Sequence, residues 1–259
     1  MGRGACGTAL SSLPRLCCNG HMDNSTAPNY RGYRFPAEII SRCVWLYFRF
    51  SLSLRDVQEM MLERGIDVSH EAIRLWTLKF GSEYARSLRC NRCGCGDTWH
   101  LDEVFLKING EQVYLWRAVD QDGEVLDILV QKRRIAKAAK RFLRKLLKSL
   151  QYIPRTIVTD KLASYGAAHA EVMALVAHRR GRCLNNRAEN SHQPTRERER
   201  RMRRFKSIRH AQRFLSVHGS VANHFRVGRH QLTTCNYRTM MRRQFAAWKK
   251  VTGSSTLSV

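Results

Sequence analysis

The spacing of the apolar residues changes sharply near residue 98, and this change restricts the possible folds more than any other feature. Within residues 36–80 the apolar side chains recur at the spacing typical of amphipathic helices. Two later runs, 98–108 and 112–119, are instead rich in β-forming residues and are joined by Asn109-Gly110, a strong signal for a tight hairpin. The sequence therefore predicts a helical region followed by antiparallel strands.

The region after this hairpin predicts a mixed α/β domain. A third strand is expected at 125–131, a helix at 135–150, and a short strand at 156–159 that ends at Asp160. A second short strand is expected at 174–177, and the remaining chain is expected to be mainly helical. This order is typical of a mixed β-sheet flanked by helices.

Residues 36–80 predict three helices with a tight turn between the last two. Ser53 and Ser69 are suited to cap the second and third helices, because a serine hydroxyl accepts a hydrogen bond from a free first-turn amide. Gly65 can adopt the left-handed conformation that ends a helix. Two helices joined by so short a turn indicate a helix-turn-helix, a motif that reads the major groove of DNA.

Composition and spacing together predict five segments. These are a disordered leader at 1–30, a helix-turn-helix DNA-binding domain at 31–80, a basic linker at 81–97, an α/β domain at 98–225 and a basic C-terminal helical tail at 226–259. The leader is rich in Gly, Ser, Asn and Cys and has no periodicity, so no packed structure is expected there.

The charge of the chain indicates a polyanionic partner. Lysine and arginine number 46 against 21 aspartate and glutamate, which gives a formal net charge of +25. Hydrophobic residues make up 43% of the chain, enough to fill a core, which argues against a disordered basic tail. No apolar run approaches the roughly 18 residues of a membrane span, and no Gly-rich phosphate loop is present. We therefore expect a cytoplasmic, nucleoid-associated protein with DNA as its partner, no membrane contact and no nucleotide cofactor.

The nine cysteines leave one further ligand hypothesis open. Their odd number and their context favour free thiols over a disulfide framework. Cys90, Cys93 and Cys95 have half the spacing of a zinc site, and His100 would have to supply the fourth ligand. Zinc binding at this position therefore remains an alternative.

Three carboxylates are the candidates for chemistry. Asp102 lies inside the first predicted strand, Asp160 follows the next buried strand, and Glu189 begins a later helix. Strand alternation places Asp102 on the opposite face from Glu103, which we interpret as a neighbour only. Three carboxylates at one point repel one another unless a multivalent cation neutralises them, and their oxygens suit two Mg²⁺ or Mn²⁺ ions. Such a pair of ions supports phosphoryl transfer on a phosphodiester.

Three motifs carry a resemblance to a known family. The runs 97–103 (DTWHLDE), 159–161 (TDK) and 185–192 (NNRAENSH) resemble a DDE transposase, specifically insertion-sequence family six, with similarity over about residues 31–250. The resemblance implies a ribonuclease-H-like catalytic core and DNA transposition with cointegrate products. It assigns the catalytic and metal-binding roles to Asp102, Asp160 and Glu189, and the basic residue beyond the glutamate to Arg196.

A dense run of cations follows Glu189. Eight cations within 14 residues are offset by only two glutamates, and such a run repels itself unless phosphates are near. The predicted DNA contacts are Arg74 and Lys79 of the third helix, and Arg196, Arg200, Arg201, Arg203, Arg204 and Lys206 of this run. The expected partners are double-stranded DNA, as terminal inverted repeats and as target, and further copies of the chain in a synaptic complex.

Two other functions stay open at this point. A decayed transposase would keep DNA binding without cleavage, and a DNA-binding regulator would use the helix-turn-helix alone. The regulator gives no reason for Asp102 and Asp160 on strands. Metal-dependent cleavage and transfer of DNA strands is therefore the predicted function.

Overall fold

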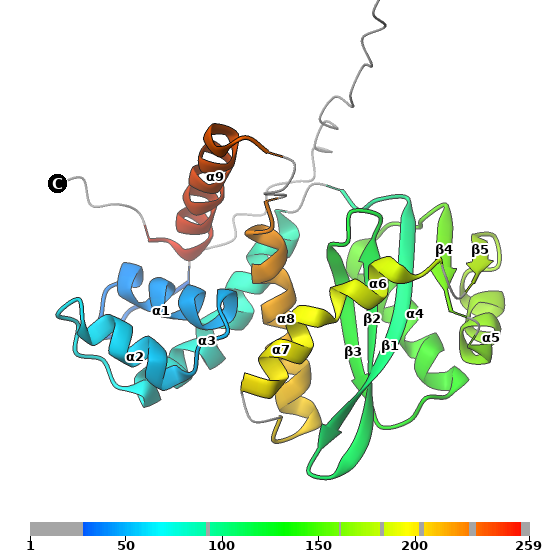
Figure 1. Cartoon of the computed structure of the whole chain (residues 1–259), viewed down its shortest axis with the longest axis horizontal. Helices are drawn as coiled ribbons and strands as arrows, with labels where there is room; N and C mark the ends of the chain where they lie inside the picture. The colour runs from blue at the N-terminus through cyan, green and yellow to red at the C-terminus, as the bar shows by residue number, and fades with distance from the viewer. Residues whose placement is uncertain are drawn as a thin grey trace, which may run out of the picture.

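The computed structural model describes residues 28–91, 94–160, 162–181, 184–201, 205–227 and 232–254. A sheet with its flanking helices forms one part of the molecule, and a group of helices forms the other (Figure 1). Within the described ranges, no helix is long and apolar enough to cross a membrane.

The helical part begins with α1 (Ala37–Arg49), α2 (Leu54–Leu62) and α3 (His70–Cys90). Ser53 caps α2 in a capping box with Asp56, and the Ser69 hydroxyl accepts a hydrogen bond from the Ala72 amide at the start of α3. Gly65 follows α2 with a φ of +74°. Both predicted caps and the three-helix arrangement are confirmed, because these local signals need no distant partner.

Helix α3 is longer than the sequence indicated. Residues 81–90, which we expected to begin a basic linker, continue the helix and bury Tyr84, Ala85 and Leu88. At Gly81, a Cβ atom would lie 3.0 Å from the Phe48 ring, so this glycine allows α1 and α3 to approach closely. Phe80, Tyr84 and Leu88 do recur every four residues, so the helical spacing runs past the predicted end of this helix at residue 80.

The sheet has five strands in the order β3-β2-β1-β4-β5. They are β1 (Thr98–Ile108), β2 (Glu111–Asp120), β3 (Val125–Gln131), β4 (Thr156–Thr159) and β5 (Ala177–Arg180). The first three are antiparallel neighbours, whereas β4 is parallel to β1 and β5 is parallel to β4. Asn109 and Gly110, with φ of 51° and 83°, form the predicted hairpin turn. The predicted mixed sheet flanked by helices is confirmed, although the last strand begins at residue 177 rather than 174.

One face of the sheet is covered by α4 (Ala136–Leu150) and α5 (Ala163–Val172). Helix α4 matches the prediction and buries Phe142 against Trp99 and Trp116 of the sheet. Helix α5 has no counterpart in the sequence prediction. Its alanines, glycine and histidine give no apolar stripe, so only packing against α4 reveals it.

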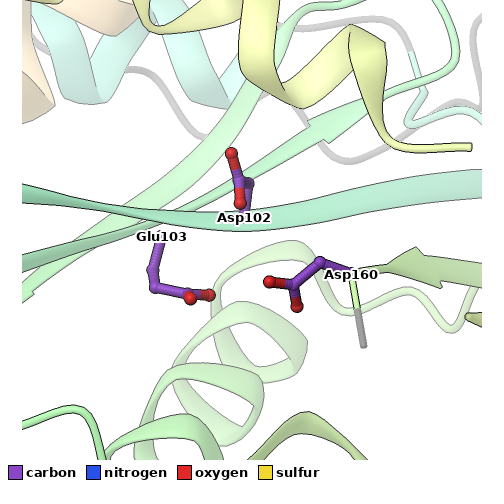
Figure 2. Close-up of side chains that lie close together, drawn as sticks. All are labelled: Asp102, Glu103 and Asp160. Atoms are coloured by element: carbon purple, nitrogen blue, oxygen red, sulfur yellow. The ribbon is translucent and has the colours of Figure 1, made fainter. Parts of the chain in front are cut away.

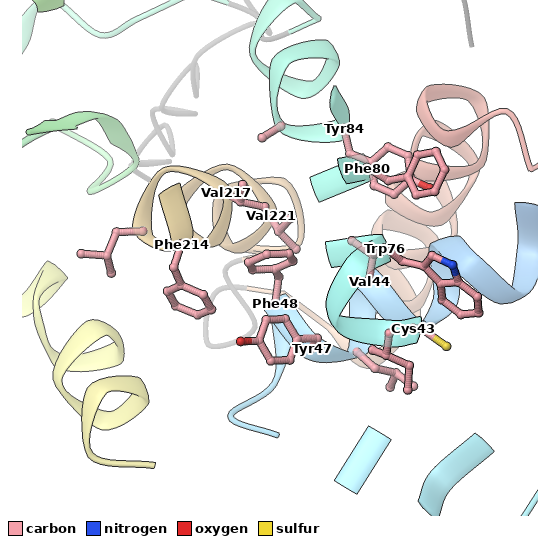
Figure 3. Packing of buried hydrophobic residues seen from close by; sticks show 14 of the residues in the cluster. Cys43, Val44, Tyr47, Phe48, Trp76, Phe80, Tyr84, Phe214, Val217 and Val221 are labelled. Carbon is pink, nitrogen blue, oxygen red and sulfur yellow. The ribbon is translucent and has the colours of Figure 1, made fainter. Parts of the chain in front are cut away.

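The opposite face packs on α8 (Ile208–His224), and the same apolar core continues into the helical part. Phe214 of α8 lies beside Tyr47 and Phe48 of α1 (Figure 3). Helix α8 also covers the open edge of β3, where Gln212 accepts a hydrogen bond from the Val130 amide at 2.8 Å. The helix-turn-helix and the sheet therefore share one core instead of being joined only by a linker.

Helix α9 (Thr234–Thr252) also belongs to this core, although we expected residues 226–259 to form a tail. The Trp248 ring lies 5.3 Å from the Tyr84 ring. Tyr30 donates a hydrogen bond to the Thr252 carbonyl at 2.6 Å, which joins the two ends of the described chain. The rest of the expected leader, 1–27, lies outside the described residues.

Candidate active site

Asp102 lies on β1 and faces the side of the sheet that α8 covers. Its side chain is 13% exposed, and one carboxylate oxygen lies 3.2 Å from Nε2 of His192. His192 ends helix α6 (Asn186–Ser191), which packs across β1 and β2. Burial lowers the pKa of His192, although the contact with the Asp102 carboxylate acts in the opposite direction.

Glu103 and Asp160 meet on the other side of β1. The Glu103 side chain is only 2% exposed, and its Oε1 accepts a hydrogen bond from Nε of Arg134 at 2.7 Å. The Arg134 Nη2 atom is 3.7 Å from the Asp160 Oδ2 atom. Burial and the nearby Asp160 charge raise the pKa of Glu103 to about 7, although Arg134 acts in the opposite direction.

Asp102, Glu103 and Asp160 form one acidic cluster, in which one carboxylate oxygen of each residue lies within 4.8 Å of the others. Figure 2 shows the Glu103 and Asp160 carboxylates facing each other, with Asp102 directed to the other side of the strand. The buried Oε2 of Glu103 accepts no hydrogen bond of standard geometry from the described residues, although the buried Tyr165 hydroxyl lies near enough to act on the pKa of Glu103. Hard oxygen donors, one of them buried without such a hydrogen bond, fit a divalent cation such as Mg²⁺ or Mn²⁺.

Glu189 lies outside this cluster. It is exposed on α6, while the preceding Asn185 donates a hydrogen bond to the Leu101 carbonyl at 2.8 Å and fixes the start of that helix over β1. The structure therefore brings together two of the three predicted residues, Asp102 and Asp160, and adds Glu103 to them.

Sequence reasoning missed Glu103 and Arg134. The alternation of β1 is as predicted, and Glu103 does face away from Asp102. Asp160, however, follows the last residue of β4, so its side chain is not confined to one face of the sheet. The only signal for Glu103 was its position next to Asp102, and the sequence holds no signal for Arg134 among so many cations.

The face that holds Asp102 also buries a cation beside it. Arg117 of β2 is directly opposite Asp102 in the strand register and is 5% exposed. Its Nη1 donates a hydrogen bond to the Thr195 hydroxyl at 2.9 Å. Burial lowers the pKa of Arg117 to about 10, which still leaves it charged at neutral pH. Thr195 belongs to α7 (Gln193–Arg201), so this contact ties the arginine-rich helix to the sheet.

Helix α7 divides its arginines between the core and the surface. Arg198 is 1% exposed, lies 4.6 Å from the Tyr47 ring centre and donates a hydrogen bond to the Phe50 carbonyl at 2.8 Å. Arg196 and Arg200 are exposed. Of the other predicted DNA contacts in this run, Arg201 is exposed and 3.3 Å from Glu197, Lys206 is exposed, and Arg203 and Arg204 lie outside the described residues.

The predicted contacts on α3 are also at the surface. Arg74 forms two hydrogen bonds with Glu71, at 2.6 and 2.8 Å, and Nζ of Lys79 lies 4.7 Å above the Tyr33 ring. Both cations are therefore held in place on the exposed side of the helix. The zinc hypothesis is not tested, because Cys93 lies outside the described residues.

Comparison with known proteins places this site in a family. Residues 96–228, just over half of the chain, match a family model described as a DDE domain. The transposase of the insertion sequence-like element IS431mec from Staphylococcus aureus is 31% identical over 170 residues, which cover 63% of this chain and 75% of that protein. The transposase of insertion sequence IS257 in transposon Tn4003, also from Staphylococcus aureus, matches with the same identity and coverage.

Two solved structures align with the chain at low sequence identity. A simian T-cell lymphotropic virus intasome, determined with the PP2A regulatory subunit B56 gamma, aligns with a TM-score of 0.42 at 16% identity, covering 69% of this chain and 67% of that chain. The Mos1 transposase catalytic domain aligns with a TM-score of 0.40 at 13% identity, covering 70% and 97%. The match to the DDE-domain family and the two transposase relatives identify the chain as a DDE transposase of insertion-sequence family six.

Proposed function

We propose that this chain binds the terminal inverted repeats of an insertion sequence and catalyses metal-dependent strand cleavage and strand transfer into target DNA, with a cointegrate as product. The observation that carries the proposal is the meeting of Asp102 of β1 with Asp160, which follows β4, within the acidic cluster of a DDE-domain sheet. Such a cluster is costly without a cation, and DNA phosphates are substrates on which carboxylate-bound cations act.

The proposed catalytic residues are Asp102, Asp160 and Glu189, and Glu103 contributes a fourth carboxylate. They would hold two divalent ions, Mg²⁺ or Mn²⁺, which when bound supply activation of the attacking oxygen and stabilisation of the leaving one. The protein orients the carboxylates through β1, the residue after β4 and α6. The hydrogen bond of Asn185 to β1 positions α6, and with it Glu189, over the strand.

DNA binding is proposed for two exposed surfaces. Arg74 and Lys79 on α3 would contact terminal DNA, as expected for the second helix of a helix-turn-helix. The surface of α7 formed by Arg196, Arg200 and Arg201, which begins beside the His192–Asp102 contact, would hold DNA near the acidic cluster. Lys206 extends this surface, and Arg203 and Arg204 are proposed as DNA contacts from the sequence alone. A synaptic complex joins two DNA ends, so a homo-oligomer acting at the nucleoid is part of the same proposal.

A strand-transfer assay with candidate terminal DNA and Mg²⁺ tests the proposal. Asp102→Asn and Asp160→Asn should each lower strand cleavage at least about 1,000-fold while leaving terminal-DNA binding within a few-fold, because electrostatic positioning dominates phosphoryl-transfer catalysis. Glu171→Gln is the matched control, since Glu171 pairs with Lys140 and Arg144 away from the cluster. Wild-type protein that binds terminal DNA without cleaving it would instead support the decayed transposase or the regulator.

A further inference from the structure

Arg134 occupies an unusual position among the cations of this protein. It lies in the segment between β3 and α4, next to Lys132 and Arg133, and all three side chains are exposed. Unlike its two neighbours, Arg134 turns its guanidinium group into the acidic cluster. Nε is 2.7 Å from Oε1 of Glu103, and Nη2 is 3.7 Å from Oδ2 of Asp160.

The Arg134 guanidinium group offsets the negative charge of the two carboxylates, as a metal ion would at this position. Glu103 is almost fully buried and Asp160 lies beside it, so two negative charges would otherwise repel each other in a poorly solvated position. Among the described residues, Arg134 is the cation that forms ion pairs with both carboxylates. The pairing is nevertheless incomplete, because Arg134 donates only to Oε1 of Glu103 and leaves the buried Oε2 without a hydrogen bond of standard geometry.

The Arg134 side chain can also move out of the acidic cluster. Its side chain is 41% exposed, whereas that of Glu103 is 2% exposed, so the arginine can rotate into solvent while the glutamate stays fixed on β1. A divalent ion that uses the same oxygens carries more charge in a smaller volume than a guanidinium group, and both cannot occupy the space between Glu103 and Asp160.

We propose that Arg134 is an internal placeholder cation, which holds Glu103 and Asp160 together in the metal-free enzyme and is released from them when a divalent ion binds. The inference rests on the proposed metal site and adds a positioning residue to it. Arg134 keeps the acidic cluster assembled before the metal binds, and it competes with the metal for the carboxylates.

The first test needs no substitution. Full-length wild-type protein is treated with phenylglyoxal, which modifies accessible arginine side chains, and the modified peptides are measured by mass spectrometry with and without Mg²⁺. Arg134 should be modified several-fold faster with Mg²⁺, and Arg133, the neighbouring exposed control, should be modified at the same rate in both conditions. An Arg134 rate that Mg²⁺ leaves unchanged would overturn the inference.

The second test measures metal affinity directly. Mn²⁺ binding to full-length Arg134→Gln and Arg133→Gln proteins, followed by electron paramagnetic resonance, compares variants with the same change in net charge. Removing a competing cation should lower the Mn²⁺ dissociation constant of Arg134→Gln about 5- to 10-fold relative to Arg133→Gln. Equal or weaker binding by Arg134→Gln would contradict the placeholder role. Absence of Mn²⁺ binding in the wild type would contradict the metal site itself, and the inference with it.

Discussion

The two faces of the sheet bury different kinds of ionisable group. On the face toward α8, burial lowers the pKa of Arg117 to about 10 and that of His218 to about 3. On the face toward α4 and α5, burial and the charge of Asp160 raise the pKa of Glu103 to about 7. On each face, burial therefore destabilises the charged form of the ionisable group relative to its neutral form.

This difference explains where the acidic cluster lies. A carboxylate in the middle of either face would be desolvated and would lack partners. Asp160 follows the end of β4, where Asp102 from one face and Glu103 from the other come within 4.8 Å of it. The site thus collects charge from both faces at a place that solvent and a cation can reach, since Asp160 is about one-third exposed.

The largest expected effect is on strand transfer, and it distinguishes Glu189 from Glu103. Glu189→Gln should lower strand transfer at least about 1,000-fold at any Mg²⁺ concentration, because the proposal places Glu189 at the reacting centre. Glu103→Gln should lower it about 10- to 100-fold at low Mg²⁺ and recover at high Mg²⁺, because Glu103 mainly adds affinity for the ion. Strand-transfer rates over a Mg²⁺ titration measure both. The reverse order would make Glu103 the essential third carboxylate.

The next effect compares buried and exposed arginines of α7. Arg198→Ala should lower the free energy of unfolding by about 3 kcal/mol, because it leaves a cavity between Tyr47 and Phe214 and removes the hydrogen bond to the Phe50 carbonyl. Arg200→Ala, at the exposed control position, should change it by less than about 0.5 kcal/mol. Urea unfolding followed by circular dichroism measures both. Equal losses would show that Arg198 does not tie α7 to the helical part.

The two faces should also respond to pH with opposite signs. Glu103 has a raised pKa in the folded state, so its contribution to stability is present below the unfolded pKa and is lost as the pH rises to about 7. His218 has a lowered pKa, so its contribution is present above about pH 6.5 and is lost as the pH falls toward 3. Each change is at most about 1.4 kcal/mol per pH unit.

These two pH dependences are tested by the free energy of unfolding, measured from pH 3 to 8 in the presence of a chelator that removes divalent ions. Glu103→Gln should flatten the stability curve between about pH 4.5 and 7, and His218→Leu should flatten it below about pH 6.5. The same change in both variants would mean that the two faces do not differ as described.

The smallest effect concerns the surface charges. Replacing Arg196, Arg200 and Arg201 by Gln should reduce the magnitude of the slope of log affinity against log salt by about two to three units, since each phosphate contact contributes about 0.9. The matched control replaces Lys137, Arg141 and Lys148, exposed cations of α4 on the opposite face of the sheet. Equal changes in the two triple variants would indicate a general charge effect rather than contact through α7.

Local signals account for the parts that were predicted well. Ser53, Ser69 and the Asn109-Gly110 turn act through hydrogen bonds and backbone angles within a few residues, so the sequence was sufficient to place them. The three motifs that contain Asp102, Asp160 and Glu189 indicated the family for a similar reason, because each is a short run of residues. The roles of those three residues remain predictions.

Tertiary packing decided what the local signals could not. Helix α5 forms where a weakly amphipathic segment packs on α4, and α9 becomes part of the core because Trp248 packs on Tyr84. Such contacts join residues far apart in the chain, and no spacing rule along the sequence encodes them.

The sequence by itself determined the helices of residues 36–80, the first four strands, the charge that indicates a polyanionic partner, and the place of Asp160 directly after a strand. Only the tertiary structure decided that Glu103 joins Asp102 and Asp160, that Arg134 turns into their cluster, and that Arg198 is buried while Arg200 is exposed. The physical reason is that burial and Coulomb interactions depend on distances in space, whereas capping, turn formation and periodicity depend on distances along the chain.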